Sequence, residues 1–523
     1  MEIKKITAAA LALGALCTAA GCGGDKAANG EKASIKYWVR NYANAYVDSY
    51  SQIAAFQKLQ EITGVDIEFI HPVVGQESEQ FNVMIASGDY PDVVEFNWGA
   101  YQGGRIKAIS DNVIITVDQY INDKTMPNFN ALLNERDDYR KALKNSDGTI
   151  SVFPHFSESI EINPYIGPTI RKDWLDKLGL SMPETIDDWY NVLKAFKERD
   201  PNGNGQQDEV PLTDDTNWAF KFLAAGFGAN FGLQLDNNGK VEFSGISDNY
   251  REYLQTMNKW YSEGLIDREY SAQTRKNVDY KMTSDISGAY VGFTGSQMGK
   301  YIAARAGDEN YKLVAAPWPK RDKNSPRYCG YDNMIRLMTS GNGAAITSKN
   351  KYVEQTLKMF DYLYSKEGQA LINYGIEGES YTVENGEYKY TDKIMHDPSG
   401  KDPVAAMAPY AIPIWGVLPS VMLNDAYDKI SRSYEEQSDA AKTWIDADMS
   451  HLLPTLSFTA EESEIISTCL ADVTTCCNEY SAKYIMGLES LDSWNTYVDK
   501  VKSMGVDKVV AAYQAAYDRY LSY

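Results

Sequence analysis

The first 22 residues have the layout of an export signal, and this layout constrains where the rest of the chain folds. Two lysines stand near the start, an apolar run covers residues 6–17, and small residues at 19–21 precede Cys22. The apolar run is shorter than the roughly 20 residues that a membrane-spanning helix needs. A short positive start, a short apolar segment and a small-residue cleavage site are typical of a signal that is removed. We therefore expect residues 1–21 to be cleaved and the remaining chain to fold outside the cytoplasm.

Residues 19–22 (AAGC) resemble the lipobox of bacterial lipoproteins, although Ala19 stands where most lipoboxes have leucine. The resemblance implies that the Cys22 thiol carries lipid and that Cys22 becomes the new N-terminus. Several acyl chains would anchor the protein stably, since each buried CH₂ contributes roughly 0.8 kcal/mol. Residues 22–34 are small and polar and are predicted to form a tether. The expected location is the extracytoplasmic side of a bacterial cell membrane, with an ordinary secreted protein as the alternative.

The size and charge of the chain restrict its class. A chain of 523 residues exceeds what one hydrophobic core usually serves, so two or more lobes are expected. The formal net charge of −21, with no basic cluster to offset it, excludes nucleic-acid binding. No second apolar run is long enough for a membrane helix. The sequence predicts a folded body that is held at a membrane by its lipid alone.

Strand-like and helix-like segments alternate in the first hundred residues of the expected body. The predicted order is strand 35–39, helix 50–63, strand 65–70, helix 81–87 and strand 92–96. Such alternation predicts an α/β lobe with a largely parallel sheet. The remainder is richer in helices, and the predicted ones cover residues 185–199, 249–263, 351–364, 461–481, 491–504 and 508–521.

The segment Asp200–Glu209 carries the strongest chemical motif. Oxygen-bearing side chains fall at Asp200, Asn202, Asn204 and Asp208, with Gly203 and Gly205 between them. Gln206 stands where an EF-hand loop supplies a backbone carbonyl, and Glu209 could supply the closing carboxylate because Pro211 occupies the usual glutamate position. This pattern predicts a structural calcium site. A polar turn without a metal is the alternative.

Catalytic patterns are weak throughout the sequence. The four histidines, at positions 71, 155, 396 and 451, lack zinc-binding spacing, and neither a GxSxG elbow nor a Walker A loop occurs. The cysteines beyond residue 22 form neither a disulfide scaffold nor a zinc pattern. With 72 acidic residues, no particular pair is marked as a glycosidase pair. We expect a binding protein rather than an enzyme.

Several stretches together resemble one known family. They are Ser87–Val94, Arg171–Leu180 with Pro183–Thr185, Asp200–Glu209, Gly375–Gly378 with Tyr381, Pro454–Leu456 and Ala516–Tyr520. In this order they are similar to the extracellular solute-binding lipoproteins of ABC importers (family 1 solute-binding proteins), in the branch of LipO-type and alginate-oligosaccharide-binding proteins. In alginate-binding members an equivalent loop holds Ca²⁺. This implies that the calcium ligands here are Asp200, Asn202, Asn204, Gln206, Asp208 and Glu209.

The resemblance also implies the architecture, namely an α/β, helix-rich, two-lobed periplasmic-binding-protein-like fold with a hinge and a central ligand cleft. The first lobe is expected to cover residues 35–155 with a return segment at about 310–370. The second lobe is expected to cover residues 156–309, including the calcium loop 200–209, with a return segment at about 371–523. The chain would pass between the lobes more than once.

The family implies a function in uptake. A solute, with oligosaccharide favoured, would bind between the lobes, shift them from open to closed, and be delivered to an ABC permease whose separate ATPase supplies energy. A monomer is expected. The 10 Trp and 37 Tyr residues fit this prediction, because their flat faces suit stacking on sugar rings. A binder of peptide or another polar solute, or a surface glycoside hydrolase, are the alternatives.

Candidate ligand contacts are aromatic residues outside the predicted helices, together with two charged residues that could bond hydroxyl groups. Trp38 and Trp98 stand at strand ends, where open α/β sheets bind ligands. The full set is Trp38, Arg40, Trp98, Trp218, Glu377 and Trp415. For each tryptophan, a place in the hydrophobic core is the alternative.

Overall fold

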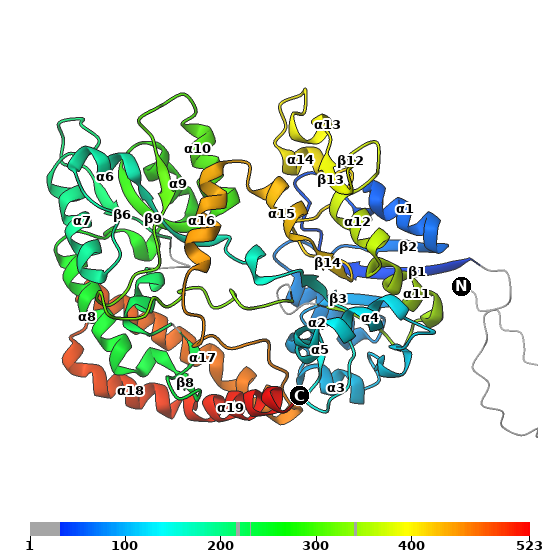
Figure 1. Cartoon of the computed structure of the whole chain (residues 1–523). Helices are drawn as coiled ribbons and strands as arrows, with labels where there is room; N and C mark the ends of the chain where they lie inside the picture. Colours follow the sequence, from blue (N-terminus) through cyan, green and yellow to red (C-terminus); the bar gives the residue numbers. More distant parts are fainter. Residues whose placement is uncertain (1–31, 216–219, 231, 339–342) are drawn as a thin grey trace, which may run out of the picture.

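The computed structural model describes residues 32–215, 220–230, 232–338 and 343–523. The signal, Cys22, the first ten residues of the expected tether and Trp218 lie outside this range. The described chain forms two lobes that lie side by side (Figure 1). Each lobe has its own four-stranded sheet and its own hydrophobic core. The predicted two-lobed α/β fold, rich in helices, is confirmed.

The sheet of the first lobe has the order β11-β3-β1-β2. Its strands are β1 (Ala33–Val39), β2 (Val65–Ile70), β3 (Val93–Phe96) and β11 (Gly343–Ile346). The pairs β1–β2 and β1–β3 are parallel, and only β11 runs antiparallel to its neighbour β3. The three strands predicted from residues 35–96 are therefore confirmed as a largely parallel sheet. Because β1 begins at Ala33, the last two residues of the expected tether belong to the fold.

Helices bury apolar side chains in the core of the first lobe. They include α1 (Ala54–Thr63), α2 (Glu77–Ser87), α3 (Gly104–Ser110), α11 (Val353–Leu363) and α12 (Lys366–Tyr374). In α1, Phe56 and Leu59 are fully buried, and burial of such side chains stabilises the fold by about 1.5–3 kcal/mol each. The helix ends at Gly64, whose φ of 69° is the left-handed conformation that glycine adopts easily.

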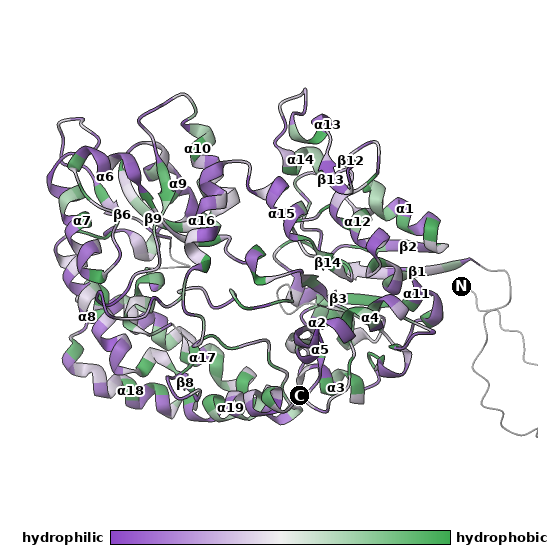
Figure 2. Cartoon of the chain, in the orientation of Figure 1, coloured by the Kyte–Doolittle hydropathy of each residue, from purple (hydrophilic) through white to green (hydrophobic). Residues whose placement is uncertain are grey.

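The second lobe is built on a mixed sheet with the order β10-β5-β9-β6. Its strands are β5 (Ile166–Arg171), β6 (Val210–Leu212), β9 (Ser287–Phe293) and β10 (Leu313–Ala315). Helices α6 (Lys172–Leu178), α7 (Ile186–Glu198) and α8 (Asp248–Ser262) surround it. Gly288 is required here, because a Cβ at this position would lie 2.3 Å from the Phe196 ring. Figure 2 shows hydrophobic colour along β3 and β9, whereas the surrounding helices have mixed faces.

Three C-terminal helices lie along one side of the second lobe and reach the first lobe near the C-terminus (Figure 1). They are α17 (Ala460–Met486), α18 (Trp494–Ser503) and α19 (Val506–Ser522). Helix α17 packs on α8 of the second lobe and also contacts α3 of the first. Arg519 and Glu462 join α19 to α17 through an ion pair (Nη1–Oε1 2.9 Å), and the Tyr523 hydroxyl donates to the Asn145 carbonyl of the first lobe (2.8 Å). These helices therefore connect the two lobes away from the crossings of the chain.

The chain crosses between the lobes three times. The first core ends at Phe156 and the second begins at Ile166; the chain returns between Met334 and Met338, and it crosses again between Ile430 and Ala440. Asn163 connects two of these crossings, because its Nδ2 donates to the carbonyls of Met334 (2.6 Å) and Arg336 (2.8 Å). The third crossing leads from α15 (Asn424–Ser431) to α16 (Glu435–Ile445).

The lobe boundaries differ from those expected from the sequence. Strand β10 pairs with β5 of the second lobe, so the start of the segment 310–370 does not return to the first lobe. Residues from Tyr374 to Ile430 pack in the first core instead of the second. The physical reason is that this segment supplies α15 and the hairpin of β12 (Tyr381–Glu384) and β13 (Glu387–Tyr390), which cover the first lobe. We infer that the chain passes from one lobe to the other near residues 160, 336 and 433.

Within the part of the chain that the structure describes, no helix combines the length and the apolar character needed to cross a membrane.

Replacing Asn163 by alanine is expected to destabilise the connection between the crossings. The change leaves two backbone carbonyls without their donor, and an unsatisfied buried group costs about 1–3 kcal/mol. We expect a lower urea midpoint for Asn163→Ala. Asn130→Ala is the control, since Asn130 bonds only the side chain of the exposed Asp123. Equal midpoints for the two variants would contradict a role of Asn163 in holding the crossings.

Candidate functional site

A cavity of about 440 Å³ lies where the crossings separate the lobes. Its wall includes Tyr165 and Phe293 from the second lobe and Trp415 from the first. The crossings add Asn163, Asn333 and Arg336 to the wall. A ligand here would touch both lobes and the segments that join them, so its binding would depend on the angle between the lobes.

Aromatic side chains from both lobes form much of the wall. Tyr165 and Phe293 lie stacked, with ring centroids 6.1 Å apart and an interplanar angle of 7°. Across the cavity, Trp415 is half-buried and lies 5.9 Å from the Tyr46 ring. Tyr427 of α15 adds a further aromatic surface. Flat apolar faces with polar edges suit a ligand that has both apolar and hydroxyl surfaces.

Two polar groups in the wall lack a partner among the described residues. The buried Oδ1 of Asn333 and the buried Nε of Arg336 make no hydrogen bond. Arg336 is paired only loosely, with Nη2 lying 3.9 Å from Asp332. It is also the one charged side chain among the described residues that line the cavity. Unsatisfied buried polar groups are costly, so these two are suited to bond a ligand.

Two acidic residues follow β6, and one of them pairs with an arginine that reaches the wall. At the end of β6, the Asp214 carboxylate accepts the backbone N–H of Asp215 (2.9 Å) and of Phe220 (2.9 Å), and burial raises the pKa of Asp214 well above its usual value. Asp215 lies 3.7 Å from Arg275, which donates to the hydroxyl of Ser296 in the wall (3.3 Å). The wall that faces the cavity thus stays mostly neutral, although the chain is strongly acidic.

Of the six ligand contacts predicted from the sequence, the structure places Trp415 in this cavity. Trp38 and Trp98 lie instead in the core of the first lobe, at 4% and 1% exposure. The Trp38 ring packs edge-on against Phe96 (5.5 Å), and Trp98 packs edge-on against Phe81 (5.4 Å). The Trp98 indole donates to a backbone carbonyl of its own lobe, so its polar edge is satisfied internally. The expectation that ligands bind at the ends of strands does not show in which direction the side chains at those ends point.

Arg40 and Glu377 lie away from the cavity wall. Arg40 pairs with Glu77 (Nε–Oε1 3.1 Å) and lies over the Tyr42 ring, 4.6 Å from its centroid. Glu377 is exposed in the turn after α12. Trp218 falls outside the described residues, so its predicted role stays a prediction.

Apart from Trp415, sequence reasoning missed the residues of the wall, among them Tyr165, Phe293, Asn333, Arg336 and Tyr427. Phe293 ends β9, so the rule about strand ends could have identified it. Tyr165 directly precedes β5 and gave a weaker signal. Asn333 and Arg336 lie on a crossing, and no local pattern in the sequence marks a crossing.

The loop predicted to bind calcium is ordered around Asp200. Its carboxylate accepts the backbone N–H groups of Gly203 (2.8 Å), Asn204 (3.1 Å) and Gly205 (3.0 Å). The amide of Asn202 donates to the carbonyl of Asp285 (3.1 Å), which joins the loop to the second lobe. The backbone of the loop is therefore folded inward around oxygen atoms.

Glu209 provides the test of whether this loop fits a cation. Both of its carboxylate oxygens are buried without a hydrogen-bond partner among the described residues. Burial raises the pKa of Glu209, and the negative charges of Asp200 and Asp208 raise it further. Asn204 donates to Asp208 (3.0 Å), so a second carboxylate faces the same loop. A divalent cation stabilises carboxylates that lie close together and lack hydrogen-bond donors. The residues of this loop therefore fit a bound Ca²⁺.

The described residues contain no cluster of three His, Cys, Asp or Glu side chains suited to holding a metal. A cation in the loop would consequently need the amide oxygens of Asn202 and Asn204 or backbone carbonyls as additional ligands.

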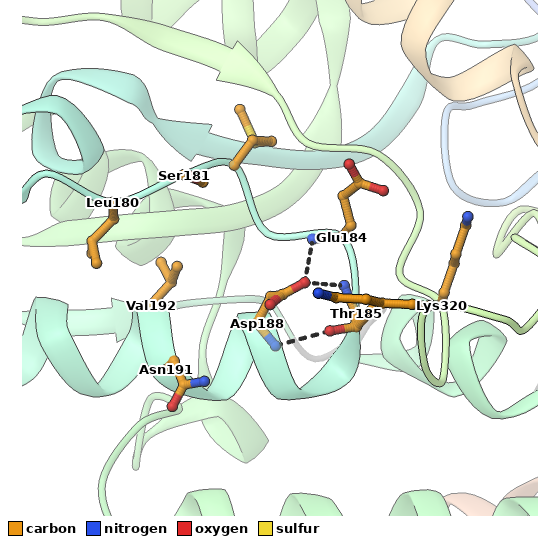
Figure 3. Close-up of a pocket in the computed structure, with 10 residues that line it drawn as sticks. Leu180, Ser181, Glu184, Thr185, Asp188, Asn191, Val192 and Lys320 are labelled. Atoms are coloured by element: carbon orange, nitrogen blue, oxygen red, sulfur yellow. Dashed lines mark hydrogen bonds between the residues drawn. The ribbon is translucent and has the colours of Figure 1, made fainter.

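A larger cavity, of about 540 Å³, lies within the second lobe at the start of α7 (Figure 3). Its residues include the capping box of this helix, in which the Asp188 N–H donates to Thr185 Oγ1 (3.1 Å) and the Thr185 N–H donates to Asp188 (3.0 Å). Lys320 lies beside it. Because one lobe supplies the whole wall, hinge motion would not close this cavity. The smaller cavity between the lobes is the better candidate site.

Two lobes joined by thin crossings, with an aromatic cavity between them, define a protein that closes around a small ligand. The chain belongs to the bacterial extracellular solute-binding protein family, whose model matches residues 42–370. The family expected from the sequence is thereby confirmed.

Curated relatives share most of the chain. It is 29% identical over 518 residues to the fructooligosaccharide ABC transporter substrate-binding protein FusA of Streptococcus pneumoniae, which covers 94% of this chain and 91% of FusA. It is 27% identical over 352 residues to lipoprotein LipO of Bacillus subtilis, which covers 65% of this chain and 66% of LipO.

Solved structures also match most of the chain. FusA in complex with kestose superposes with a TM-score of 0.72 at 26% identity, covering 94% of this chain and 99% of FusA. An EF-hand mutant of FusA in complex with fructo-nystose matches equally well, with a TM-score of 0.72, 26% identity and the same coverage of both chains. The alginate-binding protein AlgQ2 without calcium ion has a TM-score of 0.70 at 24% identity, covering 94% and 98% of the two chains, which shows the shared fold.

Proposed function

We propose that this protein is the substrate-binding component of an ABC importer and that it captures an oligosaccharide between its two lobes. The observation that carries the proposal is the meeting of aromatic faces from both lobes at one cavity: Tyr165 and Phe293 on one side, Trp415 and Tyr427 on the other. Sugar rings offer apolar C–H faces for such stacking and hydroxyl groups for amide and guanidinium partners. The kestose complex of FusA supports the same class of ligand.

The mechanism follows from the crossings. A ligand that contacts only one lobe would leave the equilibrium between the open and closed forms unchanged. A ligand that touches Phe293 and Trp415 together stabilises the closed form specifically, and this difference in contacts shifts the equilibrium. The closed complex is the form that a permease would receive.

A thermal-shift screen with neutral oligosaccharides, acidic oligosaccharides and peptides tests this function. A bound ligand raises the melting temperature by mass action, so we expect stabilisation by at least one oligosaccharide. Trp415→Ala is expected to weaken that binding by about tenfold or more, because it removes about 1.4 kcal/mol of contact. Tyr280→Ala, which changes an exposed aromatic residue remote from the cavity wall, is the control. Stabilisation by peptides but by no oligosaccharide would overturn the proposal.

We further propose that the loop 200–209 holds a structural Ca²⁺ through the six residues expected from the sequence. The orphaned Glu209 carboxylate and the turn around Asp200 support this, and so does the EF-hand that the FusA mutant's description names. The bound ion would supply positive charge that offsets the carboxylates. The loop would thereby be held against the second lobe through Asn202 and the backbone of Asp285.

Calcium is expected to raise the melting temperature of the wild-type protein, and a chelator is expected to reverse the rise. A ligand at a hundred times its dissociation constant stabilises by about 2.7 kcal/mol. Asp208→Asn and Glu209→Gln should abolish the calcium-dependent shift. Asp236→Asn is a matched control, because Asp236 also accepts backbone N–H groups in a tight turn, from Asn238 and Lys240. A melting temperature that changes with neither calcium nor chelator would contradict the proposed calcium site.

We also propose that Cys22 carries the lipid that anchors the protein outside the bacterial cell membrane. The AAGC motif supports this, and LipO, a relative, is named as a lipoprotein.

Cys22→Ala is expected to release the protein from the membrane fraction, since the thiol that receives the lipid is gone. Cys17→Ala is the matched control and should stay with the membrane, because residue 17 leaves with the signal. Fractionation followed by immunoblotting measures both. Membrane retention of the Cys22→Ala protein would contradict the anchor.

A further inference from the structure

The segment that carries Trp415 contains a strained residue. Leu418 has a φ of 61°, in the left-handed region that residues with a side chain rarely adopt. Such a conformation costs on the order of 1–3 kcal/mol and persists only where the surroundings enforce it. Leu418 lies three residues after Trp415 and two before β14 (Ser420–Met422), so its conformation sets the path of the chain along the cavity wall.

Both polar groups of the Leu418 backbone are held by buried side chains. Its N–H donates to the two carboxylate oxygens of Glu95, at 3.2 and 3.1 Å. Its carbonyl lies 3.1 Å from Nδ1 of His155. The Tyr37 hydroxyl donates to the same Glu95 carboxylate (2.7 Å) and fixes its orientation. Glu95 belongs to β3 in the middle of the sheet and is 8% exposed, so the sheet holds the strained turn through one carboxylate.

We propose that Glu95 is a positioning residue for the ligand site: its carboxylate holds Leu418 in the strained conformation and thereby keeps the Trp415 ring in the cavity wall. The proposal rests on the proposed function only in that Trp415 contacts the ligand. Glu95 itself lines neither cavity and acts through the backbone of residues 415–418.

The contact between the Glu95 carboxylate and the Leu418 N–H is called the clamp below. The clamp depends on pH, because Glu95 acts in it only as a hydrogen-bond acceptor. Burial raises the pKa of Glu95 to about 7, although the bonds from Tyr37 and Leu418 oppose the rise. Protonation converts one oxygen into a donor and weakens the bond to Leu418, since hydrogen bonds to an ionised group are roughly twice as strong as neutral ones. Raising the pH from 6 to 8 should therefore tighten the clamp.

The groups packed around Glu95 stay neutral across this range. On the flanking strands, the residues paired with Glu95 are Val39 and Ala344, which do not titrate. The titratable neighbours are the tyrosines Tyr37, Tyr50 and Tyr364, whose pKa values burial raises far above neutrality, and His155, whose pKa burial lowers to about 4. Glu95 is thus the group whose charge changes near pH 7 at this turn.

Stability and ligand binding should change in opposite directions. Because the folded state binds the Glu95 proton more tightly than the unfolded state, the contribution of Glu95 to folding stability falls as the pH rises from about 4.5 to about 7. The clamp, and with it the affinity for ligand, strengthens as the carboxylate ionises. A residue with a purely structural role would move both quantities in the same direction.

Two measurements on wild type, Glu95→Gln and the control Glu68→Gln test the proposal. Glu68 is an exposed glutamate of the same sheet. The first measurement is amide hydrogen exchange of residues 410–422 without ligand, corrected for the intrinsic rate. We expect protection in the wild type and Glu68→Gln to be higher at pH 8 than at pH 6, and protection in Glu95→Gln to be lower and independent of pH.

The second measurement is calorimetric titration with kestose at the same two pH values. We expect wild-type affinity to be about fivefold higher at pH 8 and this difference to vanish in Glu95→Gln. Normal wild-type exchange behaviour with no kestose binding would count against this sugar in the proposed function while supporting the clamp. Exchange of residues 410–422 that is independent of pH in the wild type, or unchanged in Glu95→Gln, would overturn the clamp. The wild-type pH series keeps the test decisive even if Glu95→Gln folds poorly.

Discussion

The structure depends on the separation of two hydrophobic cores between which the chain passes in short crossings. A single core could not hold a cavity at its centre, because close packing leaves no voids of that size. Here the chain leaves each core as a short segment, and the Asn163 amide joins two of these segments by donating to the carbonyls of Met334 and Arg336. The cavity lies at these segments, so a change in the angle between the lobes changes the shape of the site directly.

Energetic magnitudes explain why both lobes supply aromatic residues. One aromatic contact contributes about 0.5–1.5 kcal/mol beyond the area it buries. Shifting a two-state equilibrium from 1:99 to 99:1 needs about 5.5 kcal/mol of differential binding. Several contacts must therefore form only in the closed state, and they must come from opposite sides. The stacked pair Tyr165 and Phe293 and the Trp415 of the other lobe supply part of this energy, and the polar groups of the wall must supply the rest. The charges of Asp215 and Arg275 stay paired behind the wall.

Local patterns predicted local structure well. A helix was expected at 185–199, and α7 covers Ile186–Glu198 with Thr185 and Asp188 forming a capping box at its start; strand β2 has the predicted bounds. The sequence could not show in which direction a side chain points, or where the chain returns to a lobe it has left. Trp38 stands at a strand end as expected, yet its ring turns into the core, a choice made by packing against Phe96. The returns of the chain to each lobe depend on contacts between distant segments, which leave no local pattern. For that reason Arg336 was missed and the boundaries near 310 and 371 were misplaced.

The helices α17 and α19 lead to a further consequence. They lie along one side of the second lobe and reach the first lobe, where α17 contacts α3 and Tyr523 bonds the Asn145 carbonyl. With the crossings on one line and this brace on another, the lobes cannot separate equally in all directions. While both sets of contacts hold, the gap between the lobes would widen on the side away from these helices. A ligand would then enter and leave through the side away from these helices.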